Sequence, residues 1–141
     1  VNFKIDDRDK NELKVMADGR HLSRVFDNIF QNICKYAMEN TRVYIDVELI
    51  LGKAEDSSTY EAKNRVCISV KNMSEQSLNI SGEELTERFV RGDVSRNTEG
   101  SGLGLSIAQS LMKLQNGNLD VIIDGDLFKI ILTLDEAVSD L

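Results

Sequence analysis

Two stretches of the chain repeat their hydrophobic residues at the spacing of one helix face. The first runs from Leu22 to Ala37, with apolar side chains three and four positions apart: Leu22, Val25, Phe26, Ile29, Phe30, Ile33 and Ala37. This period predicts an amphipathic helix that buries one stripe against a core, with Asp18 as its N-cap. The same period from Leu103 to Gln115 predicts a second helix, with Gly117 as its C′ glycine.

Polar and apolar residues alternate in other segments, which predicts half-buried β-strands. The expected strands are Val1–Ile5, Val15–Ala17, Arg42–Leu49, Val66–Val70, Leu119–Ile123 and Phe128–Leu134. We expect Arg42–Leu49 and Val66–Val70 to pair antiparallel through the polar loop Gly52–Asn64. The sequence Asp124-Gly125-Asp126 predicts a tight hairpin between the last two strands. The whole pattern predicts an α+β fold, a two-layer α/β sandwich in which helices cover one face of a mixed sheet.

The segment from Asn72 to Ser101 has little periodicity and many polar residues. Within it, Ser81 and Glu84 have the spacing of a capping box, which predicts a short helix. A loop of this length in a compact domain is usually functional, and often it is a lid over a ligand.

Composition narrows the classes of partner. The chain has 141 residues, which predicts a single domain over 1–141, and its formal net charge is −7. An acidic chain is poorly suited to bind nucleic acid or an anionic membrane surface. The sequence contains no apolar run long enough to span a membrane and no signal segment. It begins at Val1, so we expect it to be a fragment of a larger protein.

The two cysteines, Cys34 and Cys67, both lie in apolar periodic segments. We expect two buried, reduced thiols rather than a disulfide. Neither cysteine has a second Cys or His at the spacing of a metal site, which disfavours zinc.

A line of polar residues follows the edge of the first helix's apolar stripe. At about 100° per residue, Asn28, Asn32 and Lys35 fall within about 60° of one another, with Tyr36 beside them. An Asn carbonyl oxygen suits Mg²⁺, and a Lys one turn away can neutralise phosphate oxygens. Tyr36 can cover the edge of a sugar or base. The same residues would also suit an ordinary solvated helix face.

The second helix is preceded by a glycine loop, Gly100-Ser101-Gly102-Leu103-Gly104-Leu105. Glycines let successive backbone N–H groups turn toward an anion, and the helix N-terminus adds its positive dipole end. A flexible hinge before a helix is the other interpretation. The loop is neither a Rossmann fingerprint nor a P-loop, because no strand directly precedes it and no Gly-Lys-Ser/Thr follows.

With these motifs in this order, the sequence resembles the catalytic, ATP-binding domain of bacterial sensor histidine kinases, whose superfamily includes gyrase B, Hsp90 and MutL. Asn28 to Tyr36 looks like the family's N box, Glu87 to Asp93 like its F box, and Gly100 to Leu105 like its G2 box. The resemblance covers about Asp18 to Leu134. It implies the Bergerat-type ATP-binding fold, with a lid over the nucleotide.

The resemblance implies a role for each matching residue. Asn32 would bind Mg²⁺, Asn28 would support the metal and phosphate shell, and Lys35 would contact phosphate. Tyr36 would line the nucleotide pocket, and Phe89 and Arg91 would belong to the ATP lid. The glycine loop would bind phosphates, with backbone donors from Gly100, Gly102 and Gly104, and its other nucleotide-binding residues would be Ser101, Leu103 and Leu105.

The sequence departs from the family in the G1 box, which usually reads Asp-x-Gly-x-Gly. The corresponding stretch, Lys71–Gln76, has no glycine, and this loss is expected to restrict the backbone beside the base. Asn72 stands where the family has an Asp that accepts a hydrogen bond from the adenine amino group. Its carbonyl can still accept that bond, but it is neutral. The alternative to a working ATP site is therefore a degenerate regulatory module with weak or no ATP binding.

The resemblance also implies a reaction. ATPases of the superfamily use a Glu one turn before the metal-binding Asn to activate water, and that position here is Asn28, which is no base. This favours transfer of the γ-phosphoryl group from Mg-ATP to a histidine, while ATP hydrolysis stays open as a further alternative. The only histidine, His21, is followed by Leu22 rather than an acidic residue. We therefore expect the acceptor on a separate helical dimerisation and phosphoacceptor domain.

The family implies the remaining partners. The full-length protein would be a homodimer anchored in the bacterial cell membrane, with this domain in the cytoplasm and with no nucleic acid partner. A response regulator would receive the phosphoryl group from the helical domain. The fragment alone is expected to be a monomer.

Overall fold

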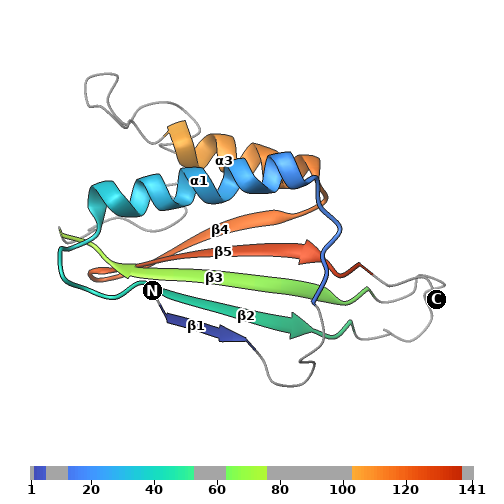
Figure 1. The fold of residues 1–141 in the computed structure, drawn as a ribbon, viewed down its shortest axis with the longest axis horizontal. Coiled ribbons are helices and arrows are strands. Elements are labelled where there is room, and N and C mark those ends of the chain that lie inside the picture. The colour runs from blue at the N-terminus through green and yellow to red at the C-terminus, as the bar shows by residue number, and fades with distance from the viewer. Residues whose placement is uncertain (1, 6–12, 53–62, 76–102, 138–141) are drawn as a thin grey trace.

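A computed structural model of the chain describes residues 2–5, 13–52, 63–75 and 103–137 (Figure 1). Its elements in chain order are β1 (Asn2–Ile5), α1 (Gly19–Tyr36), β2 (Tyr44–Ile50), β3 (Arg65–Met73), α3 (Leu103–Leu114), β4 (Asn118–Asp124) and β5 (Leu127–Asp135). Both long helices and five of the six predicted strands are confirmed. The strand expected at Val15–Ala17 is wrong. Only an isolated bridge joins Val15 to Glu136, because β5 ends at Asp135.

The strands form one mixed sheet in the order β1-β2-β3-β5-β4. β1 pairs parallel with β2, whereas the β2–β3, β3–β5 and β4–β5 pairs are antiparallel. The predicted antiparallel pairing of Arg42–Leu49 with Val66–Val70 is therefore confirmed in β2 and β3. Both described helices lie on the same face of the sheet (Figure 1), which confirms the predicted two-layer α+β architecture.

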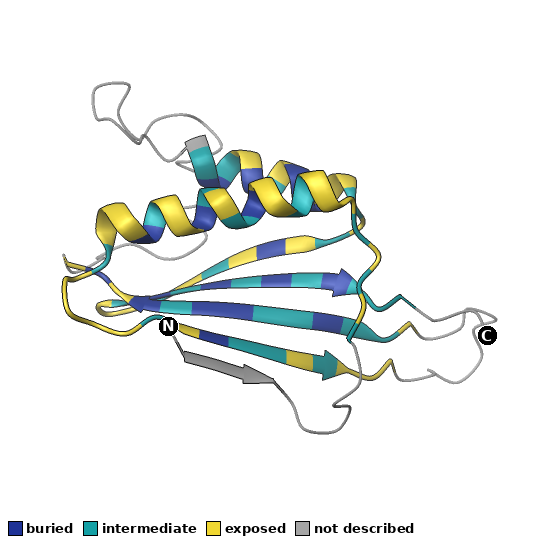
Figure 2. Cartoon of the chain, viewed as in Figure 1, coloured by how far each residue is buried: buried dark blue, intermediate teal, exposed yellow. Residues whose placement is uncertain are grey.

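The core fills the space between the sheet and the helices. Alternate residues of β5 are buried, and three buried residues of β3, Val66, Val70 and Asn72, lie opposite buried residues of β5 (Figure 2). Core residues at most 1% exposed include Val25, Ile29, Ala108, Met112, Val70, Ile130 and Leu132. Burying one such larger side chain is worth about 1.5–3 kcal/mol, so apolar contact is the main force that joins the two layers.

The N-terminus of α1 is held by two side chains, that of its N-cap Asp18 and that of Gln115, the residue after α3. Oδ1 of Asp18 accepts hydrogen bonds from the N–H groups of Arg20 at 2.9 Å and His21 at 3.3 Å, which confirms the predicted N-cap. The bonds from His21 and Arg20 hold the pKa of the Asp18 carboxyl below its usual value. The N–H of Asp18 donates to Oε1 of Gln115 at 2.8 Å, which ties α1 to the end of α3.

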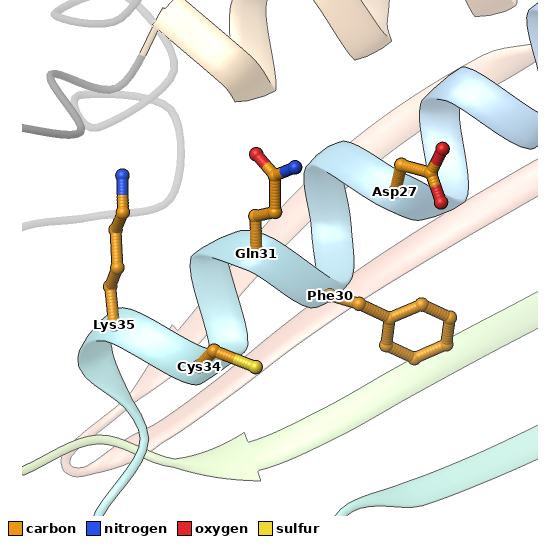
Figure 3. A pocket seen from close by; sticks show the side chains of 5 residues that line it. All are labelled: Asp27, Phe30, Gln31, Cys34 and Lys35. Carbon is orange, nitrogen blue, oxygen red and sulfur yellow. The ribbon is translucent and has the colours of Figure 1, made fainter.

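The buried stripe of α1 is narrower than the sequence predicts. Phe30 is 37% exposed, and its ring stacks on Phe26 with centroids 6.2 Å apart. Cys34, one helical turn further, is also exposed, so the prediction of a buried thiol there is wrong. Both side chains point away from α3 (Figure 3). Cys67 is partly buried, and this burial raises the pKa of its thiol; both cysteines are free, as predicted.

The end of α3 corrects the prediction for Gly117. The residue with positive φ is Asn116, at 56°, so Asn116 rather than Gly117 occupies the C′ position. The N–H of Gly117 then donates to the carbonyl of Met112 at 2.9 Å, as in a Schellman motif. Gly117 is glycine for lack of space: a Cβ there would lie 2.9 Å from the carbonyl oxygen of Thr133 and 2.8 Å from a methyl of Leu134.

The structure describes the β4–β5 hairpin and the end of β3, but not two of the longer connections. The β4–β5 hairpin is confirmed, and Gly125 has a φ of 59° in its turn. β3 extends to Met73, so Asn72 belongs to the strand and not to the polar segment that follows. The loop at 53–62 and residues 76–102, which include the predicted capping box of Ser81 and Glu84, lie outside the described residues. Within the part that is described, no helix is long and apolar enough to cross a membrane.

Candidate functional site

The N-box helix and the last part of the glycine loop meet directly. Nδ2 of Asn28, in the middle of α1, donates a hydrogen bond to the carbonyl of Gly104, in the first turn of α3, at 3.2 Å. Both residues are partly buried. α3 runs back along α1, so its N-terminus lies over the middle of that helix (Figure 1). Two residues 76 positions apart in sequence thus lie on one surface, where the N-terminus of α3 can attract an anion.

The other polar residues of α1 continue from Asn28 toward the helix C-terminus. Asn32 is partly buried one turn further along, and Lys35 and Tyr36 are exposed. Lys35 projects from the last turn of the helix, as Figure 3 shows. The polar groups along the helix are therefore two amides, an ammonium and a phenol, in that order. This order suits a ligand with its phosphates beside the middle of the helix and a less charged group beside its C-terminus.

The C-terminus of α1 is joined to the end of β3 by backbone pairing. The N–H of Glu75 donates to the carbonyl of Tyr36 at 2.9 Å, and the N–H of Met38 donates to the carbonyl of Met73 at 2.8 Å. Between them, Ala37 and Ser74 form an antiparallel bridge. This short ladder puts the stretch that corresponds to the G1 box beside the end of the N box.

The ladder also explains why this stretch needs no glycine at its first G1 position. The N–H of Ser74 donates to the carbonyl of Asp126 at 2.7 Å, which continues the pairing of β3 with the β4–β5 hairpin. In the described part of the chain, the non-glycine residues with positive φ are Asn40 and Asn116. Ser74 therefore has an ordinary extended backbone, and the expected restriction from a missing glycine is not found there. Gln76, the second such position, lies outside the described residues.

Asn72 holds the least satisfied polar group of this region. The residue is 4% exposed, and its Oδ1 atom is buried without a hydrogen-bond partner. Its Nδ2 atom makes only a long contact of 3.4 Å with the carbonyl of Met73. Asn72 lies opposite Phe128 of β5, on the face of the sheet that the helices cover. A buried acceptor without a donor costs about 1–3 kcal/mol, so this oxygen suits a donor group on a ligand.

The residues present fit a magnesium ion that is held mainly by its nucleotide. The described residues contain no group of three or more His, Cys, Asp or Glu that could hold a metal by themselves. Mg²⁺ commonly uses one or two protein oxygens and fills its other positions with phosphate oxygens and water. The amide oxygen of Asn32 is of the right kind for that arrangement.

The other predicted site residues are placed only in part. Phe89, Arg91, Gly100, Ser101 and Gly102 lie outside the described residues. Leu103 begins α3. The side chain of Leu105 is 4% exposed in the core cluster, so only its backbone can contribute to a phosphate site.

The structure adds a shallow hollow that the sequence analysis missed. It has a volume of about 390 Å³ and is lined by five residues of α1: Asp27, Phe30, Gln31, Cys34 and Lys35. Phe30 and Cys34 point to one side of the helix, and Gln31 and Lys35 point to the other (Figure 3). The exposed ring of Phe30 and the thiol of Cys34 make its floor apolar. Phe30 gave no signal in the sequence, because its position is also compatible with the buried stripe.

Comparisons with known proteins identify the family and the fold. The family model described as histidine kinase-, DNA gyrase B- and HSP90-like ATPase matches residues 17–137. The chain is 34% identical over 125 residues to the probable sensor protein PcoS of Escherichia coli, covering 86% of this chain and 24% of PcoS. It is 28% identical over 110 residues to the sensor protein VanS of Enterococcus faecium, covering 77% and 25%. The chain thus spans about a quarter of the length of these relatives.

Solved structures show the same fold. The nucleotide-free catalytic domain of the histidine kinase ThkA superposes with a TM-score of 0.67 at 26% identity, covering 96% of this chain and 77% of that one. Full-length ShkA, solved in complex with AMPPNP, superposes with a TM-score of 0.66 at 19% identity, covering 99% and 26%. The second likeness is one of fold alone.

Proposed function

The chain belongs to the family of histidine kinase-, DNA gyrase B- and HSP90-like ATPases, and we propose that it binds Mg-ATP and donates the γ-phosphoryl group to a histidine on a separate domain. Its similarity to sensor kinases supports a place in two-component signalling. The observation that carries the proposal is the convergence of three motifs. The Asn28–Gly104 bond joins the N box to the glycine loop, and the 36–38/73–75 ladder joins the N box to Asn72.

Each residue of this surface has a chemical task in the proposed reaction. Asn32 would hold Mg²⁺ through its amide oxygen, and Lys35 would offset charge on the phosphates. Asn28 is a positioning residue, because its bond to Gly104 fixes the first turn of α3 against α1. Backbone N–H groups at the start of α3 would meet the phosphates. Phosphoryl transfer needs little covalent help from the protein, so positioning and charge neutralisation are its main contributions.

The same surface favours transfer to a protein over hydrolysis. A water-activating base would have to replace Asn28, whose amide is neutral and already donates to Gly104. The neighbouring Asp27 is exposed and lies about 100° around the helix from Asn28. The position one turn before Asn32 therefore carries no carboxylate.

The degenerate-module alternative rested on the altered G1 box. Two observations weigh against it: Ser74 has an unstrained backbone, and Asn72 keeps a buried, unpaired acceptor oxygen. A stretch that had lost its ligand would gain stability by replacing such a group with an apolar one. We therefore keep nucleotide binding in the proposal.

The acceptor and the partners belong to the proposal as well. His21 lies in the first turn of α1, with its N–H bound to Asp18, at the helix end opposite Lys35 and Tyr36. The acceptor histidine is therefore sought on a helical domain of the longer protein, which would pass the phosphoryl group to a response regulator. We propose that the longer protein is a membrane-anchored homodimer and that this domain faces the cytoplasm.

Calorimetric titration of the chain with ATP, in Mg²⁺ and then in EDTA, tests nucleotide binding. We expect a Kd between micromolar and submillimolar, about −8 to −4 kcal/mol, that weakens without metal. Asn32→Ala should weaken Mg²⁺-dependent binding about 10–100-fold without lowering the melting temperature. Asn118→Ala removes an exposed amide on β4 and serves as the matched control. Unchanged affinity in Asn32→Ala would remove Asn32 from the metal site.

Phosphotransfer is tested by adding the helical domain of the longer protein to the chain and γ-labelled ATP. Acid-labile label on that domain supports the kinase. Release of free phosphate at several turnovers per minute, without transfer, would instead identify a hydrolase.

A further inference from the structure

The side chain of Asn72 is a neutral group that carries both a donor and an acceptor. A carboxylate at the same position would offer acceptors only. Asn72 is 4% exposed, and its Oδ1 atom has no partner. The 3.4 Å contact of its Nδ2 atom with the Met73 carbonyl is longer than the usual 2.7–3.2 Å of such bonds. Neither the oxygen nor the nitrogen of the amide therefore makes a short hydrogen bond within the protein.

The backbone around Asn72 is held by hydrogen bonds on both sides. Only the side-chain amide can therefore change its orientation toward a ligand. Residues 73–75 are paired on one side with residues 36–38 and on the other with the carbonyl of Asp126. Asn72 also lies within the β3–β5 ladder, opposite the buried Phe128. The terminal torsion of an Asn side chain has a broad, roughly two-fold profile. Half a turn about this bond exchanges Oδ1 and Nδ2 without moving the strand.

From this we infer that the side-chain amide of Asn72 recognises the base of a purine nucleotide in either of two rotamers. The inference rests on the proposed nucleotide site and on the place beside the base that the family resemblance implies for Asn72. In one orientation Oδ1 accepts a hydrogen bond from the C6 amine of adenine. In the other, Nδ2 donates to the C6 carbonyl of hypoxanthine or guanine. The substrate class is thus purine nucleoside triphosphates, including those with a 6-oxo base, rather than ATP alone.

Adenine stays the preferred base. The orientation that accepts from an amine keeps the contact between Nδ2 and the Met73 carbonyl. The rotated orientation loses this contact and turns Oδ1 toward the same carbonyl. Because the lost contact is long, the preference is small. A carboxylate at position 72 would instead repel the carbonyl of a 6-oxopurine in either orientation.

Calorimetric titration of the unmodified chain with Mg-ATP and Mg-ITP tests the inference without any variant. ITP replaces the amine of ATP with a carbonyl at the same carbon. We expect ITP to bind no more than about tenfold more weakly than ATP. Binding of ATP together with a hundredfold or greater loss for ITP would overturn the inference. If neither nucleotide binds, the proposed function fails and the inference fails with it.

Two variants assign the effect to the amide. Asn72→Asp should keep ATP binding and lower ITP binding at least a hundredfold relative to ATP. If that variant does not fold, Asn72→Leu, which has a similar shape and no polar atoms, should bind ATP and ITP equally and more weakly. Asn116→Asp makes the same amide-to-acid change at an exposed position and should leave the ATP/ITP ratio unchanged. A wild-type ATP/ITP ratio in Asn72→Asp, or wild-type affinity for both nucleotides in Asn72→Leu, would overturn the role of Asn72.

Discussion

The two ends of α1 are built differently. At its N-terminus, hydrogen-bonding groups are used within the protein: Asp18 caps the helix, and Gln115 receives the N–H of Asp18. At its C-terminus, Lys35 is exposed, and the Oδ1 atom of Asn72 is buried without a partner. We call these the closed end and the open end. The closed end contributes stability, whereas the open end holds polar groups in a position that suits a ligand better than it suits folding.

The core between the two ends does not share this difference. Val25 and Ile29 are fully buried, and so are Ala108 and Met112 of α3. A rigid layer of this kind lets the open end keep a costly polar atom, because the apolar contacts of the core outweigh it. The difference between the ends agrees with the nucleotide site proposed at the open end.

The largest effect on stability is expected from Gly117→Ala at the closed end. The added Cβ would lie within about 3 Å of a backbone oxygen of β5, and relief requires that α3 and β5 shift. We expect a loss of about 1–3 kcal/mol in urea denaturation. The matched control is Gly104→Ala, where the nearest side-chain atom is 3.8 Å away. That change should be neutral or stabilising, since Ala favours a helix. Equal losses in both variants would contradict the steric explanation.

Asn72→Leu at the open end should have the opposite sign. It removes a buried, unpaired oxygen, and the Met73 carbonyl keeps its bond from Met38. We expect a gain of about 1 kcal/mol in the free energy of unfolding, together with weaker ATP binding. Parallel denaturation and titration of the same preparation would measure both. A fall in the free energy of unfolding would mean that Oδ1 of Asn72 already has a hydrogen-bond partner. The Asn72 amide would then not destabilise the open end.

The cap at Asp18 should make the closed end sensitive to acid. Hydrogen bonds from His21 and Arg20 lower the pKa of this carboxyl in the folded state. Its contribution is present above the pKa of the unfolded chain and is lost as pH falls through the folded value. Asp18→Asn keeps the cap but has no carboxyl to titrate. Comparing melting temperatures between pH 3 and 7, we expect a smaller acid-induced fall in the variant. Identical pH profiles would refute this.

The smallest effect on stability is expected from Lys35→Ala. The side chain is exposed in the last turn of α1, and substitutions of this kind usually change stability by less than about 0.5 kcal/mol. ATP binding should nevertheless fall roughly tenfold, because a charge beside the phosphates is lost. The fall should be smaller at high salt. Lys113→Ala, in the last turn of α3, is the control. A loss of ATP binding of the same size in the control would point to net charge rather than position.

Local pattern was sufficient to predict most elements and the line of polar residues along α1. The periods of α1, α3 and the strands predict their type, because each period reports which side of an element is buried. The polar line of Asn28, Asn32 and Lys35 follows from the same helix geometry. Phe30 and Cys34 were misassigned, since the sequence does not show how wide a stripe the neighbouring elements cover.

Other features depend on residues far apart in the chain, and only the tertiary structure decided them. The bond from Asn28 to Gly104, the pairing of residues 36–38 with 73–75, and the lack of space at Gly117 all follow from how helices and strands pack. The burial of the Asn72 amide depends on the register of β3 with β5. By itself, the sequence determined the elements and the order of the motifs. Packing determined which motifs meet and left the Oδ1 atom of Asn72 without a partner. Such contacts depend on strand register and on the distance between packed elements, and the spacing of hydrophobic residues within one element does not report either.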